Sequence, residues 1–96
     1  MKLVIIAYNE ALDEEVIEAL SASGLESFTR WKQVEGKGTK SGYHLGNHIW
    51  PGYVNVLMVG TNDENAARLV EELKKLKSQF SHEGVKAFVL PVEETV

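Results

Sequence analysis

The chain has 96 residues, of which 44% are hydrophobic and 25% are charged, with a formal net charge of −4. These values are typical of one globular domain, and the acidic balance argues against a dedicated nucleic-acid-binding protein. The absence of cysteine excludes disulfides, thiolate metal sites and a catalytic thiol, and favours a cytoplasmic location. Since no apolar run is long enough to cross a bilayer, we expect no direct membrane insertion.

The first half of the chain predicts a strand, a helix and a second strand. Residues 3–7 are a continuous apolar run, which suits a strand with both faces covered. Asn9 is a suitable N-cap for a helix that ends near Gly24. Its first turn is acidic, as the helix dipole favours, and its apolar residues recur at helical spacing: Leu12, Val16, Ala19 and Leu20. Residues 28–34 alternate charge with bulk and predict a strand, either at a sheet edge or leaving the sheet as it runs into the glycine-rich loop.

The second half predicts the same kinds of element. Residues 53–59 form a more apolar strand, suited to the sheet centre, and Gly60 is expected to end it. The Thr-Asn-Asp-Glu sequence of residues 61–64 is a capping-box pattern that makes Thr61 the N-cap of a second helix. An apolar stripe then runs from Ala66 to Phe80. Residues 85–90 predict a last strand, which Pro91 stops.

The order of elements is therefore β-α-β-β-α-β, the ferredoxin-like split βαβ pattern of the α+β class. It predicts one domain over residues 1–96, with a four-stranded antiparallel sheet and two helices on one face. The other sheet face has no third layer to cover it. We therefore expect copies of the chain to associate through that face.

A glycine-rich loop separates the second and third strands. Gly36, Gly38 and Gly42 let the backbone approach a ligand closely, and Lys37 and Lys40 add positive charge suited to a phosphate. The spacing is that of neither a Walker loop nor a dinucleotide-binding fingerprint. Two interpretations stay open: an effector-binding segment, and a hairpin that uses glycine for shape and lysine for solubility.

The same loop carries other candidate residues. His44 and His48 are four residues apart and are candidate ligands of a divalent metal ion, or simply solvated side chains. Trp31 and Trp50 are candidate interface anchors, with packing in a core or between subunits as the alternative. Ser41 lies near His44, but no carboxylate is placed to orient the pair. We therefore expect a protein that is not an enzyme.

Two motifs, one after the second predicted strand and one at the start of the last, are similar to motifs of a known family. The first closes the second strand and the other enters the last strand: Val34-x-Gly36-x-Gly38-x-x-x-Gly42 and Gly84-x-Lys86-x-Phe88-Val89. With this element order, the chain resembles the PII nitrogen-regulatory signalling family, as a divergent and shortened member. The resemblance implies a homotrimer that binds a small effector, such as an adenine nucleotide, in its intersubunit clefts. It also implies a protruding T-loop, residues 38–52, that docks on a protein partner such as a transporter or an enzyme.

The resemblance assigns roles to residues of this chain. It implies effector binding by six residues: Gly36, Lys37, Gly38, Lys40, Gly84 and Lys86. It implies partner binding by four residues of the loop: Tyr43, His44, His48 and Trp50. The chain also departs from the family, since Lys40 replaces a glutamine and the tail carries Glu93 and Glu94 where the family has arginines. The alternative is a metal-binding regulator like those of the divalent-cation tolerance family, which are also ferredoxin-like trimers.

Overall fold

The computed structural model describes residues 1–38, 42–44, 52–80 and 84–96. Its elements are, in order, β1 (Lys2–Asn9), the short 3-10 helix η1 (Glu10–Leu12), α1 (Asp13–Ala22), β2 (Thr29–Val34), β3 (Gly36–Gly38), β4 (Gly42–His44), β5 (Val54–Thr61), α2 (Asp63–Gln79) and β6 (Val85–Pro91). In these parts of the chain, no helix combines the length and the apolar character needed to cross a membrane.

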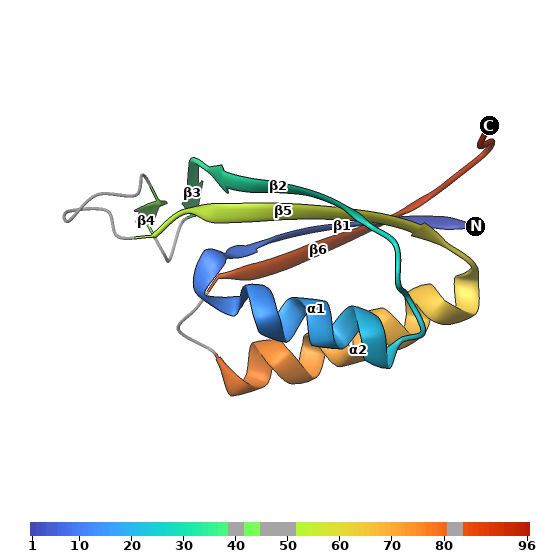
Figure 1. Ribbon diagram of the computed structural model, residues 1–96, viewed down its shortest axis with the longest axis horizontal. Helices are drawn as coiled ribbons and strands as arrows, with labels where there is room; N and C mark the ends of the chain where they lie inside the picture. Colours follow the sequence, from blue (N-terminus) through green and yellow to red (C-terminus); the bar gives the residue numbers. More distant parts are fainter. Residues whose placement is uncertain (39–41, 45–51, 81–83) are drawn as a thin grey trace.

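The main sheet is antiparallel, with the strand order β2-β5-β1-β6. Both helices lie against one face of this sheet, and no described element covers the other face (Figure 1). The predicted ferredoxin-like fold is thus confirmed, including the edge position of β2 and the central position of β5. We call the uncovered face the open face.

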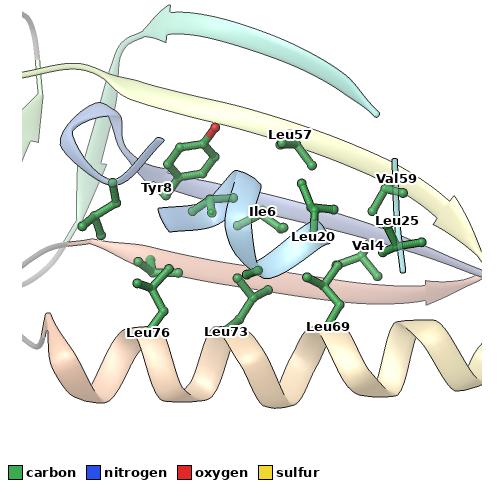
Figure 2. Packing of buried hydrophobic residues seen from close by; sticks show 14 of the residues in the cluster. Val4, Ile6, Tyr8, Leu20, Leu25, Leu57, Val59, Leu69, Leu73 and Leu76 are labelled. Carbon is green, nitrogen blue, oxygen red and sulfur yellow. The ribbon is translucent and has the colours of Figure 1, made fainter. Parts of the chain in front are cut away.

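The core lies between the sheet and the two helices. Val4, Ile6 and Tyr8 alternate along β1 toward the helices, as the period of two in a strand requires, and are all buried. Leucines of α1, α2 and β5 pack against them (Figure 2), among them Leu20, Leu57, Leu69, Leu73 and Leu76. Each fully buried side chain of this kind contributes roughly 1.5–3 kcal/mol to folding.

The start of α2 differs from the predicted one. Its N-cap is Asn62, whose Oδ1 accepts a hydrogen bond of 2.7 Å from the backbone N–H of Asn65. Thr61 is the last residue of β5. The prediction that Gly60 ends this strand is also wrong, because Gly60 pairs with Leu3 in a continuous ladder. A ladder needs only backbone groups, so a glycine on its open face does not interrupt it.

The predicted start of the first helix is confirmed in part, and its predicted end is confirmed. Asn9 caps the 3-10 helix η1, where its Oδ1 accepts from the backbone N–H of Ala11 at 2.9 Å, and α1 itself begins at Asp13. Gly24 follows the helix with φ +79°, the left-handed conformation that favours glycine after a helix end.

The glycine-rich loop contains a small hairpin, which was one of the two interpretations left open for this segment. β3 and β4 pair with Gly36 opposite His44, Lys37 opposite Tyr43 and Gly38 opposite Gly42. This hairpin lies at one end of the main sheet, and both termini lie at the other end (Figure 1). The start of α1 and the start of β6 also lie at the hairpin end, so segments distant in the sequence meet there.

Candidate effector site

The ends of four strands lie side by side at the hairpin end of the sheet. Tyr8 and Val85 are paired there, and Val54 is paired with both Asn9 and Val34. Backbone hydrogen bonds extend the order past the strands: Asn9 N–H donates to the carbonyl of Gly84 at 2.8 Å, and Glu10 N–H donates to that of Tyr53 at 3.0 Å. Gly84 and the end of β2 therefore lie at the same end of the sheet.

The predicted effector residues nevertheless form two separate groups. Gly36–Gly38 follow β2 at one edge of the sheet, whereas Gly84 and Lys86 belong to the β6 edge. Three strand spacings separate these edges, a distance of about 14 Å. A single phosphate group cannot contact both groups within one copy of the chain.

Apolar side chains occupy the open face between the two groups. A row across the sheet joins Lys86, Ala7, Val56 and Trp31, and the next row joins Phe88, Ile5, Met58 and Thr29. Trp31 is 49% exposed and Phe88 is 52% exposed. The ammonium of Lys86 lies 5.9 Å from the centre of the Phe88 ring, a cation–π contact at the border of the apolar surface.

A β-bulge ends β2 just before the glycine segment. Trp31 pairs with Val56 and Val34 pairs with Val54, so three residue steps of β2 face two steps of β5. Gln33, within this bulge, has φ +57°, a left-handed conformation that costs a residue with a side chain about 1 kcal/mol. Its backbone N–H donates to Oδ1 of Asn55 at 3.0 Å, so a side chain replaces a backbone partner there.

Asn55 belongs to a polar network centred on the carboxylate of Asp13. Oδ1 of Asp13 accepts from the Tyr8 hydroxyl at 2.6 Å and from Nδ2 of Asn55 at 3.2 Å. Oδ2 accepts from the guanidinium of Arg30 at 2.9 Å. Figure 2 shows the Tyr8 hydroxyl directed toward β5. One carboxylate thus joins the first turn of α1 to β1, β2 and β5.

This network is absent from the expectations drawn from sequence. Asp13 is one of four acids around the first turn of a predicted helix, which suggests only an interaction with the helix dipole. A usable signal was Asn55, a polar residue inside the apolar run 53–59. It is 3% exposed in the structure, and a buried amide needs partners.

The glycine at position 36 avoids a tight contact. A Cβ at Gly36 would lie 3.0 Å from Cγ2 of Val54, so Val54 would have to move by a few tenths of an ångström to admit a side chain there. A Cβ at Gly84 would meet no atom within 4 Å. The first glycine therefore lets β3 lie close to Val54, and the second is not demanded by contacts among the described residues.

A family model for the nitrogen regulatory protein P-II matches residues 1–96. The chain belongs to this family. No curated protein matches the chain.

Solved structures of similar fold agree with this assignment. CPII, a nitrogen regulatory PII-like protein from Thiomonas intermedia K12 bound to ADP, AMP and bicarbonate, superposes with a TM-score of 0.76 at 20% identity, over 93% of this chain and 82% of that one. A PII-like signalling protein from Thermus thermophilus gives a TM-score of 0.66 at 25% identity, over 93% and 83%. The apo form of CPII gives 0.66 at 16% identity, over 95% and 89%.

The charge state of the network follows from its contacts. Burial alone would raise the pKa of Asp13, but hydrogen bonds from Tyr8 and Asn55 and the positive charges of Arg30 and Lys32 outweigh it and lower that pKa. Burial and the bond to Asp13 raise the pKa of Tyr8 well above its ordinary value. At neutral pH this P-II family member therefore holds a carboxylate at Asp13 and a neutral phenol at Tyr8.

The lowered pKa of Asp13 predicts an acid-sensitive contribution to stability. A carboxyl with a lower pKa in the folded state stabilises the protein fully above its unfolded pKa of about 3.9, and this contribution is lost as pH falls through the folded value. We expect Asp13→Asn to lower the free energy of unfolding by about 1–3 kcal/mol at pH 7. The deficit should begin to shrink below about pH 4 and disappear as pH falls through the lower pKa of the folded state, where the parent carboxyl becomes protonated.

Urea unfolding of both proteins from pH 2.5 to pH 7 measures this effect. Glu18→Gln, a change at an exposed carboxyl of the same helix, is the control and should follow the parent. A deficit for Asp13→Asn that stays constant over the whole pH range would contradict the prediction.

A hollow of about 410 Å³ lies beside the network. Acids of η1 and α1 line one side, and Lys32, Gln33 and Asn55 line the other. Within the described ranges, no group of three or more His, Cys, Asp or Glu side chains is arranged to hold a metal ion. The hollow is therefore assigned no metal.

Several predicted residues have no described position. Lys40, His48 and Trp50 lie outside the described residues, whereas Tyr43 and His44 are placed by their backbone in β4. The metal hypothesis for His44 and His48 and the partner-binding role of the loop therefore stay predictions. Trp31, the other candidate anchor, is half exposed on the open face rather than in the core.

Proposed function

We propose that this P-II family member is a trimeric signalling protein that binds an adenine nucleotide between subunits and regulates a protein partner through residues 38–52. One observation carries the proposal. The two groups of predicted effector residues lie at the same end of the sheet, on opposite edges, with an uncovered apolar face between them. If copies pack through that face, the β2 edge of one copy can meet the β6 edge of the next.

Such a meeting would build a phosphate site from both groups. The glycine segment Gly36–Gly38 would offer backbone N–H groups, and Lys86 of the neighbouring copy would offer its ammonium. Adenine nucleotides are the class to test first, because the CPII structure of the same fold contains ADP and AMP. A regulatory role rather than catalysis agrees with the family to which the chain belongs.

Removal of the Lys86 charge should weaken nucleotide binding. We expect Lys86→Gln to reduce the affinity for ADP at least tenfold, because the ammonium lies at the border of the apolar surface and would face the phosphates in the proposed cleft. Isothermal titration with ADP, AMP and ATP, each with and without bicarbonate, measures the effect.

Lys74→Gln is the matched control, because Lys74 lies on α2 in an exposed ion pair with Glu71. It should bind ADP as the parent does. Equal affinities of Lys86→Gln and the parent would remove Lys86 from the site. An absence of binding by the parent at millimolar nucleotide would contradict the nucleotide proposal itself.

A further inference from the structure

A continuous chain of hydrogen bonds connects the first turn of α1 to the end of β2. Asp13 accepts from the Asn55 amide at 3.2 Å, and the Asn55 carbonyl oxygen accepts from the Gln33 N–H at 3.0 Å. We propose that Asp13 and Asn55 are positioning residues that hold the left-handed Gln33 and so fix the direction in which Gly36–Gly38 leave the sheet. The part of this inference that concerns effector binding rests on the function proposed above.

The bulge needs such a support because its conformation is unfavourable for glutamine. Gln33 has φ +57°, and a residue with a Cβ prefers the regular strand conformation. If the bulge relaxed into a regular ladder, the extra residue would be absorbed and everything after it would shift by one position. A shift by one residue turns each later side chain to the opposite face and each later N–H group to the opposite side of the strand. The glycine segment would then present different backbone groups.

Asp13 determines which way the Asn55 amide points. A carboxylate only accepts hydrogen bonds, so it binds the NH₂ group of Asn55 and leaves the carbonyl oxygen for Gln33. The hydroxyl of Tyr8 and the guanidinium of Arg30 hold the carboxylate itself in place. Because Asn55 is 3% exposed, its amide depends on these two contacts for its hydrogen-bond partners.

This chain of hydrogen bonds, which we call the relay, ends at Gln33, three residues before the start of β3 at Gly36, and Gly36 itself packs against Val54. Val54 and Asn55 are neighbours in β5, so the same strand fixes both the bulge and the start of the hairpin. Asp13 and Asn55 need not contact a ligand at the glycine segment, and they act on that segment through the backbone of Gln33.

The test first replaces Asn55, which accepts the hydrogen bond from Gln33, and then replaces Gln33 by glycine, which needs no such support. Asn55→Leu keeps a side chain of similar size but cannot accept from Gln33. We expect amide hydrogen exchange at Gly36, Lys37 and Gly38 to become at least tenfold faster, and the affinity for ADP to fall at least tenfold. Adding Gln33→Gly should restore both, because glycine adopts the left-handed conformation without a penalty.

Two further variants make the result decisive. Leu76→Ala removes a buried side chain of α2 and should lower stability without changing the exchange pattern at the glycine segment. If Asn55→Leu does not fold, Asp13→Ala replaces it with the same expected direction and the same restoration by Gln33→Gly.

Each outcome decides a separate part of the inference. Unchanged exchange at Gly36–Gly38 overturns the positioning role, whatever the nucleotide result. Faster exchange with parental ADP affinity overturns its connection to effector binding. If the parent itself binds no ADP, the proposed function fails, while the exchange measurements still decide whether the relay positions the glycine segment.

Discussion

Phe88→Asp should convert the proposed assembly into single chains of 10.7 kDa. Phe88 lies on the open face of the edge strand β6 and is 52% exposed in one copy, so the change costs an isolated chain little. In an assembly that covers this face, the new carboxylate would be buried against Ile5 and the neighbouring copy without a partner. An unpaired buried charge costs several kcal/mol, enough to prevent association at micromolar concentration.

Sedimentation velocity of the parent and the variant measures the change directly. Ala67→Asp adds the same charge on the exposed side of α2, in the layer away from the open face, and should leave the assembly intact. A parent that sediments as a single chain would contradict both the prediction and the trimer. An unchanged sedimentation coefficient for Phe88→Asp would place the interface elsewhere.

Leu69→Ala should be the most destabilising single change in α2. Leu69 is fully buried between α2 and the sheet (Figure 2), and its truncation leaves a cavity that close-packed neighbours cannot fill. Comparable substitutions cost about 2–5 kcal/mol, a large share of the stability of a domain of this size. Chemical unfolding at one fixed protein concentration measures the loss, since the proposed association would also contribute to stability.

The adjacent residue provides the control. Arg68→Ala removes only an exposed ion pair with Glu64, of the i, i+4 type, and should cost about 0.5 kcal/mol or less. A loss below about 1 kcal/mol for Leu69→Ala would show that the helix layer is not held by close packing at this point.

The fold could be predicted from the sequence because its signals are local. Short apolar runs identify β1 and β5, a period of about four in the apolar residues identifies α1 and α2, and Gly24 marks a helix end. The bounds of an element were harder to predict where two local signals competed. Thr61 and Asn62 are both good caps, and the ladder with β1 extends far enough to make Thr61 part of the strand.

The candidate site was less predictable because it depends on contacts between residues far apart in sequence. The hydrogen bond between Asp13 and Asn55 joins residues 42 positions apart, and no local sequence pattern predicts it. The bulge at Gln33 likewise arises from pairing with β5, since nothing in residues 28–34 favours a left-handed glutamine. The two groups of predicted effector residues could be named from motifs, but their separation across the sheet needed the strand order.

The two edges of the sheet differ in how well they resist unwanted pairing. The bulge at Gln33 interrupts β2, and a broken ladder is a poor template for another strand. β6 pairs with β1 without interruption from Val85 to Pro91, and of its seven residues only Val85 is buried. A variant that stays a single chain would leave this regular edge available to any extended peptide. We therefore expect aggregation through β6 to limit the concentration at which a dissociated form such as Phe88→Asp stays in solution.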